Sequence, residues 1–286
     1  MSKVMVVTDS TSYVPLELLK GHPVQFVPLQ VIWGQTTYRD GVDIQPDEFY
    51  SRLGQDPVNP STSQPTPEEF KKVYASLIEE GYDILSMHIS SKLSGTLDSA
   101  YQAKKAFPGA KITIVDSLTT SMALGFQVMA ASRMAKMGAT LDECKVVAEK
   151  AVQHTGLFFT PSTLEFLRRG GRIGNAAAFL GTVLNLKPIL QIKDGLIEPV
   201  EKVRTLNKAI DRVLDLVEDQ ISQSRGTVHL AAIQAGVIQK GDALLEKALK
   251  RFSSSLVSDA VVAGISPVIG THVGPGALGL AYMAEM

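Results

Sequence analysis

Cysteine is nearly absent from this sequence, since the 286 residues include only Cys144. A disulfide within the chain is therefore excluded, and a metal site with cysteine ligands is implausible. The five histidines are scattered and do not show the spacing of metal ligands. We therefore expect no bound metal ion.

The sequence also lacks an excess of charge and a long apolar run. Lys and Arg number 28 against 29 Asp and Glu, which gives a formal net charge of −1. This balance argues against nucleic acid and anionic membrane surfaces as partners. No segment reaches the roughly 18 apolar residues of a membrane-spanning helix. The apolar run in MSKVMVVTDS is too short for a signal peptide, so we expect a cytoplasmic protein.

Hydrophobic residues make up 45% of the chain and charged residues 20%, which is enough to bury a large core. The length suits one large α/β domain or two smaller ones. Apolar stretches typical of strands, at 3–8, 83–89 and 111–117, alternate with helical patterns at 67–81 and 95–107. This rhythm favours a parallel sheet with helices on both faces.

Short sequence signals predict the start of one helix and the positions of two loops. Thr66 precedes Pro67, and Glu69 follows three residues after the threonine, which predicts a capped helix start. The segment 56–67 holds four prolines and is expected to be an ordered loop or a linker. The stretch GQTTYRDGVDI, at 34–44, is also expected to form loop and turn.

The pattern changes near Thr155, so we expect two domains, at 1–155 and 156–286. In the second half, a hairpin that turns at Asp194–Gly195 is predicted. The apolar run 176–186 is expected in the core or in the wall of a pocket where the domains meet.

Hydroxyl side chains follow three predicted strands, in TDST (8–11), HISSKLSGT (88–96) and VDSLTTS (115–121), and the loop STSQPT (61–66) adds more. Ligands of open parallel sheets bind beyond the carboxyl ends of the strands. Hydroxyls and helix N-termini can together hold an anion without a lysine, and Gly95 would let a ligand approach the backbone closely. Ser and Thr also cap helices and turns, so a structural role stays open.

Three catalytic sites would need residues that this sequence only partly supplies. Ser94 and His272 could form a nucleophile and a base, but KLSGT lacks the first glycine of a nucleophile elbow and no orienting acid is evident. Thr11 stands where an Asp-x-Asp phosphatase needs its second acid. RRGGRIGNA is not the dinucleotide fingerprint that follows a strand. No cofactor is therefore expected, and a hydrolase that depends on Ser94 remains an alternative.

Two glycine-rich segments hold further candidates. A helix C-terminus explains Arg168, Arg169 and Gly170, because basic residues and a glycine are favourable there. It does not explain why Arg172 follows two glycines. GTHVGPGALG surrounds His272 with glycines, which is typical of a structural loop but would also allow close approach of another group.

Five motifs in this order, DST, STSQPT, SSKLSGT, LEFLRRGGRI and GTHVGPGALG, resemble the DegV family of bacterial fatty-acid-binding proteins. The resemblance covers the chain from Lys3 to its end; Thr66, where serine is equally expected, keeps the hydroxyl. It implies a two-domain α/β fold: an N-terminal Rossmann-like parallel sheet with helices on both faces, and a C-terminal α/β domain with a mixed sheet. A long-chain fatty acid would lie between the domains, in a protein that is not itself an enzyme.

The resemblance also implies roles for particular residues. Thr62 and Ser94 would hold the carboxylate, with His272 near the head group. Arg172 and Arg204 are candidates for a phosphotransfer or partner face. In some relatives the protein carries the acyl group for a separate fatty acid kinase, which supplies ATP and metal. A carrier that serves no kinase, or an acyl hydrolase that uses Ser94, are the alternatives.

Overall fold

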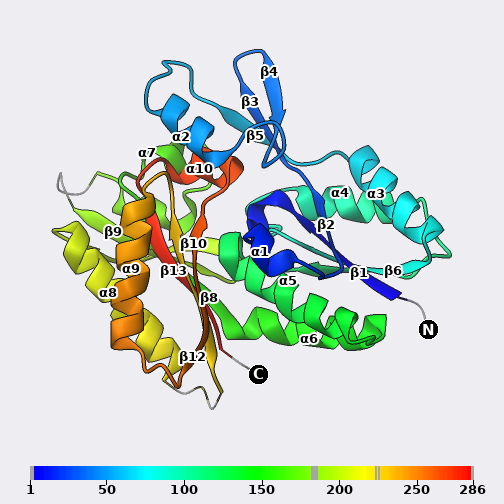
Figure 1. The fold of residues 1–286 in the computed structure, drawn as a ribbon. Helices are drawn as coiled ribbons and strands as arrows, with labels where there is room; N and C mark the ends of the chain where they lie inside the picture. Colours follow the sequence, from blue (N-terminus) through cyan, green and yellow to red (C-terminus); the bar gives the residue numbers. More distant parts are fainter. Residues whose placement is uncertain (1–2, 182–185, 223, 225, 285–286) are drawn as a thin grey trace.

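Four parallel strands form the first sheet of the computed structural model, which describes residues 3–181, 186–222, 224 and 226–284 (Figure 1). Their order is β2-β1-β6-β7. Parallel strands covered on both faces are buried on both sides, and β1 and β6 are buried along most of their length. The strand bounds are β1 Lys3–Asp9, β2 Val24–Val27, β6 Tyr82–His88 and β7 Ile112–Asp116.

Helices cover both faces of this sheet, as the sequence predicts. Thr66 and Thr140 each begin a helix with a capping box, in which the threonine hydroxyl and a glutamate three residues later bond to each other's backbone amides. The helices α3 and α4 pack on one face, and α5 and α6 on the other. Their bounds are α3 Pro67–Glu79, α4 Thr96–Lys104, α5 Ser121–Lys136 and α6 Leu141–His154.

The second sheet has six strands in the order β10-β9-β8-β13-β11-β12. It is mixed, because the neighbours β11 and β12 run parallel while the other neighbouring strands run antiparallel. The hairpin turn at Asp194–Gly195 is confirmed: both residues have positive φ, of 49° and 81°. The strands are β8 Thr155–Thr160, β9 Lys187–Lys193, β10 Leu196–Val203, β11 Val228–Gln234, β12 Val257–Gly264 and β13 Leu278–Ala284.

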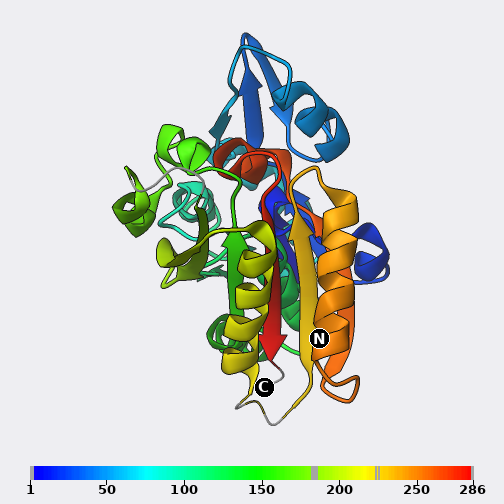
Figure 2. The same ribbon diagram turned by 90° about the vertical axis from the view of Figure 1, so that its left-hand side faces the viewer.

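Two amphipathic helices, α8 Leu206–Ile221 and α9 Ile238–Arg251, cover the outer face of the six-stranded sheet (Figure 2). The opposite face packs against α5, which also contacts β1 of the first sheet. The helix α5 is consequently buried along most of its length. The layers are therefore helices, parallel sheet, helices, mixed sheet and helices, which confirms the predicted α/β class. The division at residue 155 remains a prediction.

A small third sheet, in the order β4-β3-β5, was not predicted. The stretch 34–44, expected as loop, contains β4, and the proline-rich segment contains β5. The expectations were wrong for these strand residues alone, because the short strands exist only through pairing with β3 from another part of the chain, while most of the rest of both segments is loop and turn. The bounds are β3 Gln30–Trp33, β4 Thr36–Arg39 and β5 Ser61–Ser63; α2 spans Pro46–Leu53, α1 Leu16–Leu19 and η1 Ser10–Ser12.

Two expectations in the second half also need correction. The glycine-rich segment near His272 begins inside a helix, α10 Pro267–Val273, because the Ser266 hydroxyl caps the amide of Ile269 and Pro267 takes the first position. The apolar run 176–186 is not core in its described part: it starts within the 3₁₀ helix η2, Gly174–Phe179, which lies on β10 and buries only Ala176. Residues 182–185 of that run lie outside the described residues. The remaining helix, α7, spans Glu165–Arg169.

Candidate functional site

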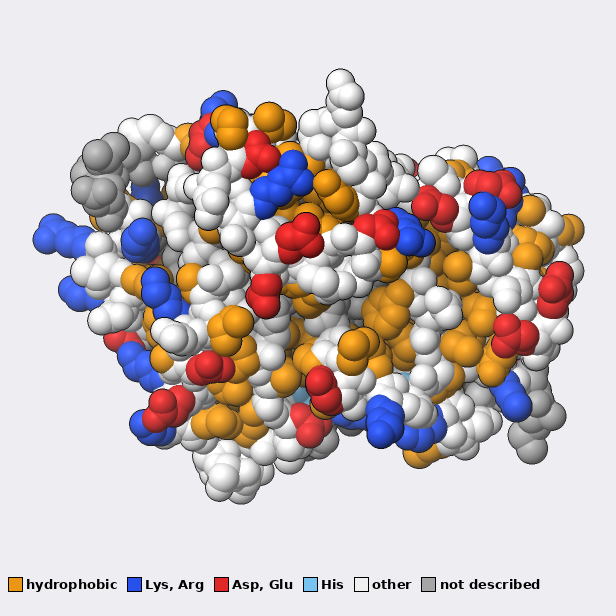
Figure 3. Space-filling view, turned by 45° about the horizontal axis from the view of Figure 1, so that its top comes forward, with side chains coloured by type: hydrophobic (Ala, Val, Ile, Leu, Met, Phe, Trp, Pro, Cys, Tyr) orange, Lys and Arg blue, Asp and Glu red, His pale blue; other side chains and the backbone are white. Residues whose placement is uncertain are grey.

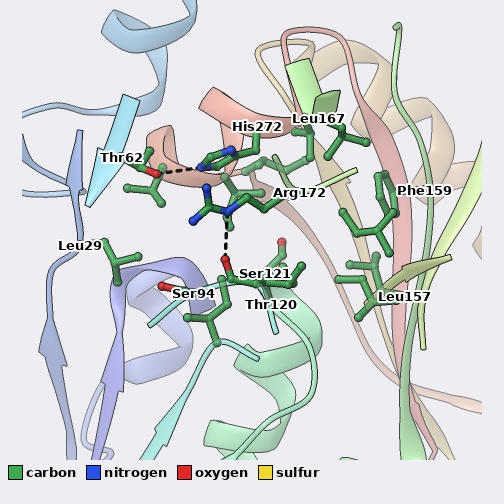
Figure 4. A pocket seen from close by; sticks show the side chains of 18 of the residues that line it. Leu29, Thr62, Ser94, Thr120, Ser121, Leu157, Phe159, Leu167, Arg172 and His272 are labelled. Carbon is green, nitrogen blue, oxygen red and sulfur yellow. Dashed lines mark hydrogen bonds between the residues drawn. The ribbon is translucent and has the colours of Figure 1, made fainter. Parts of the chain in front are cut away.

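A pocket lies between the carboxyl end of the parallel sheet and the inner face of the mixed sheet (Figure 4). The space between its walls, counted together with the open solvent at its mouth, is about 810 Å³. Most of its wall is aliphatic or aromatic, from both halves of the chain. These side chains are Leu29, Ile89, Leu93, Leu157, Phe159, Leu167, Ile192, Ile197, Ile233, Ile265, Val268, Ile269 and Val273.

One end of the pocket is polar, and it brings together four of the predicted site residues: Thr62, Ser94, Arg172 and His272. Thr62 Oγ1 and His272 Nε2 are hydrogen-bonded at 2.8 Å, although 210 residues separate them in the chain. The strand β5 presents Thr62 because it pairs with β3, and α10 presents His272. The two segments whose structure was misjudged from the sequence thus build this contact.

The imidazole of His272 is neutral at physiological pH. Burial, and secondarily the positive charge of Arg172, lower the pKa of His272 to about 4. Its Nδ1 is buried and has no hydrogen-bond partner among the described residues. The polar end therefore offers a neutral ring next to a hydroxyl.

Arg172 supplies the positive charge of the site and lies against the protein instead of projecting freely. Its Nε donates to the carbonyl of Leu93 at 3.2 Å, and its Nη1 donates to the carbonyl of Gly170 at 2.7 Å. Gly171 permits this turn with a φ of 68°. No Asp or Glu is among the described residues that line the pocket, so an anionic ligand would be the natural counter-ion of this guanidinium.

Ser94 and Gly95 sit between β6 and α4. Ser94 Oγ is hydrogen-bonded to Thr96 Oγ1 at 2.9 Å, and Gly95 is the residue before the first turn of α4. A Cβ on Gly95 would lie 2.5 Å from Nε2 of Gln64, so the glycine makes room for that side chain. Gln64 lines the pocket but was not singled out from the sequence, although it stands within the quoted STSQPT motif.

The other hydroxyl clusters divide into structural and pocket-lining groups. In TDST, Asp9 is fully buried: its carboxylate accepts the amides of Thr11 and Ile89, at 2.9 and 2.8 Å, and it faces His88 Nδ1 at 3.2 Å. This network fixes the backbone between β1 and β6, and Asp9 does not line the pocket. In VDSLTTS, by contrast, Thr120 and Ser121 do line it.

The geometry does not support a serine hydrolase. Ser94 bonds to Thr96, while His272 bonds to Thr62, so the required nucleophile and base are not paired. No carboxylate within the described residues orients His272 through Nδ1. Nor does the described part of the chain hold a group of three or more His, Cys, Asp or Glu that could bind a metal ion.

Arg204 is the one predicted site residue that lies apart from the others. It is exposed, directly after β10, and is not among the residues that line the pocket. Lys and Arg side chains gather toward the edge of the molecule where α8 and β9 lie, whereas both signs of charge mix over the rest of the visible face (Figure 3).

Comparisons with known proteins agree with this architecture. The model of a family described as "Uncharacterised protein, DegV family" matches residues 3–285. A DegV domain-containing protein from Streptomyces coelicolor is 39% identical over 279 residues, 97% of each chain. Two solved structures have the same fold. The first is described as "Fatty Acid Binding of a DegV family Protein from Thermus thermophilus"; it has a TM-score of 0.92 and 36% identity, and the match covers 99% of this chain and 100% of that one. The second is DegV, "a fatty acid binding protein from Bacillus subtilis", with a TM-score of 0.89, 31% identity and 100% coverage of both chains.

None of the helices in the described part of the chain has the length and the apolar character needed to cross a bilayer.

Proposed function

The chain belongs to the DegV family, and on that premise we propose that it binds a long-chain fatty acid in this pocket and presents the carboxylate to a separate fatty acid kinase. The observation that carries the proposal is the polarity of the pocket: a mostly aliphatic wall leads to an end with hydroxyls that include those of Thr62 and Ser94, a neutral imidazole and a single cation. A fatty acid has the same distribution, since one anionic group terminates an apolar chain.

The roles of the two ends follow from their energies. Each buried methylene contributes about 0.8 kcal/mol, so about fourteen of them give a gross ~11 kcal/mol. Each hydrogen bond to the charged head adds about 1.5–3 kcal/mol. Association and ordering subtract at least about 4 kcal/mol. The chain therefore dominates affinity, while Thr62 and Ser94 fix the position of the carboxylate.

Presentation to a kinase is supported by what surrounds the head. Arg172 is exposed at the mouth, so the carboxylate beside it would be within reach of a partner. Hydroxyls neutralise a carboxylate less than a bidentate arginine fork does. A carboxylate oxygen could then attack the γ-phosphorus of ATP bound to the kinase, which forms an acyl phosphate and releases ADP. Arg204 and the basic edge in Figure 3 suit an acidic partner surface.

A titration tests the binding step. The delipidated protein is titrated with fluorescent fatty acid, which is then displaced with palmitate, and native mass spectrometry of the protein as purified identifies any lipid it carries. We expect one saturable site with micromolar or tighter affinity. The absence of both saturable binding and a co-purified lipid would overturn the proposal.

A second assay tests the kinase step. The loaded protein is mixed with a fatty acid kinase, ATP and Mg²⁺, and acyl phosphate is trapped with hydroxylamine. Arg172→Ala, Arg204→Ala and His272→Ala are compared with Lys150→Ala, an exposed cation on α6. We expect the first three to lose more acyl phosphate than lipid affinity. Normal product from all three would leave a carrier that serves no kinase as the better description.

A further inference from the structure

The wall of the pocket contains a second pair of hydroxyls that the carboxylate site does not use. Thr120 and Ser121 line the pocket, and their side chains are 5% and 2% exposed. Neither hydroxyl oxygen has a hydrogen-bond partner among the residues that the structure describes. Buried polar atoms are nearly always hydrogen-bonded, so two neighbouring exceptions on the wall of a cavity point to a partner that the ligand supplies.

These hydroxyls stand at the N-terminus of α5, a helix of 16 residues. Thr120 is its N-cap residue but makes no capping bond, whereas Thr66, Thr140 and Thr205 all cap their helices through the side chain. The hydroxyl of Thr120 is therefore not used by the helix that it begins. A helix N-terminus favours oxygen acceptors that approach its amides.

The pair lies near the carboxylate end of the pocket. The amide of Ser90 donates to the carbonyl of Thr119 at 2.9 Å, and the amide of Ser94 donates to the carbonyl of Ser90 at 3.1 Å. Two backbone hydrogen bonds thus connect the start of α5 to Ser94. Figure 4 draws Ser94, Thr120 and Ser121 along the lower wall, opposite Thr62 and His272.

We propose that Thr120 and Ser121 form a second polar subsite that binds an oxygen substituent close to the carboxylate, so that the pocket prefers a fatty acid with a hydroxyl near its head to the unsubstituted acid of equal length. This inference rests on the proposed function, because it assumes that a fatty acid occupies the pocket. A hydroxyl on the ligand can donate to one side chain and accept from the other, which satisfies both. Sites built to bond a substrate hydroxyl discriminate strongly against ligands that lack it.

The test is a displacement titration of the full chain with three ligands: palmitate, palmitate hydroxylated on its third carbon, and palmitate hydroxylated on its twelfth carbon. We expect the third-carbon hydroxyl to improve affinity about tenfold over palmitate, close to 1.4 kcal/mol. The twelfth-carbon hydroxyl should give no improvement, because it would lie in the apolar part of the pocket.

Variants assign the preference to the pair. The double variant Thr120→Val/Ser121→Ala should lose the preference for the third-carbon hydroxyl, while palmitate still binds. Thr119→Val is the matched control, since its hydroxyl is also buried and without a hydrogen-bond partner among the described residues, yet Thr119 does not line the pocket. This control should keep the preference. Thermal unfolding of each variant checks that it folds.

Each outcome bears on a distinct claim. Equal affinity of the wild-type protein for palmitate and the third-carbon derivative, or a preference for palmitate, overturns the inference and leaves fatty acid binding intact. A preference that survives in the double variant also overturns it. If none of the three ligands binds, the proposed function itself fails.

Discussion

The ring of His272 occupies the space in which any residue other than glycine at position 170 would place its Cβ. A methyl group on Gly170 would overlap Nδ1 of the imidazole. The first glycine of the GGRI segment thus leaves the room in which His272 lies against Thr62, while the second turns the chain so that Arg172 reaches the carbonyls of Leu93 and Gly170.

This contact predicts the effect of Gly170→Ala. The new methyl should push His272 away from Thr62, cost about 1–3 kcal/mol of unfolding free energy through overpacking, and weaken fatty acid binding about tenfold. Gly109→Ala is the control, because a Cβ there meets nothing within 4 Å. Chemical denaturation and ligand titration measure both effects. Equal behaviour of the two variants would contradict the packing argument.

Thr62 and Ser94 are predicted to act on one carboxylate. Thr62→Val and Ser94→Ala should each lose about 1–3 kcal/mol of binding free energy, because each removes a hydrogen bond to a charged group. Ser61→Ala, an exposed hydroxyl on the same strand as Thr62, should change affinity little. Displacement titrations give the affinities of these variants and of the double variant Thr62→Val/Ser94→Ala. If the double variant bound palmitate as tightly as the wild type, the head group would bind elsewhere.

The neutral state of His272 predicts one component of the pH dependence of stability. Its pKa is about 4 in the folded protein and 6.5 for an ordinary histidine. As pH falls from about 6.5 to about 4, the unfolded chain gains a proton here that the folded protein does not, so the unfolding free energy decreases by up to about 1.4 kcal/mol per pH unit. His272→Gln should lack this component. Denaturant titrations between pH 4 and 7 measure the unfolding free energy of both proteins. If it changed with pH equally in the variant and the wild type, the prediction would be wrong.

Asp40 should contribute with the opposite sign. Burial raises the pKa of Asp40 to about 7 although the Ser10 hydroxyl donates to it at 2.7 Å. Between pH 3.8, the ordinary value, and about 7, the unfolded chain loses a proton that the folded protein retains. Stability from this group is complete below the lower value and is lost as pH rises through the upper one. Asp40→Asn should remove this decrease in unfolding free energy. If the variant lost as much stability as the wild type when the pH is raised, Asp40 would not be its cause.

Much of the fold could be predicted because its signals are local. The parallel sheet follows from apolar strands that alternate with helices, and the capped start at Thr66 and the turn at Asp194–Gly195 are each encoded within a few residues. The meeting of Ser94 with the α5 N-terminus follows from the same topology, since strand ends of a parallel sheet share an edge.

What could not be predicted depends on long-range pairing and on burial. The polar strand β5 is stable only because it pairs with β3, and nothing near Thr62 indicates this. Ser266 and Pro267 do carry a helix-start signal, but the glycine and the β-branched residues in VIGTHV have low helix propensity and obscure it. The apolar character of residues 176–186 does not determine whether another element of the fold covers them. In η2, the 3₁₀ helix in which this run starts, only Ala176 is buried.

A crystal structure of the protein with palmitate tests the central claim most directly. The account predicts that the carboxylate lies within hydrogen-bond distance, about 2.5–3.2 Å, of Thr62 Oγ1 and Ser94 Oγ, with the chain between Leu157, Phe159 and Ile233. A carboxylate at the apolar end of the pocket, or a fatty acid bound outside it, would contradict the account.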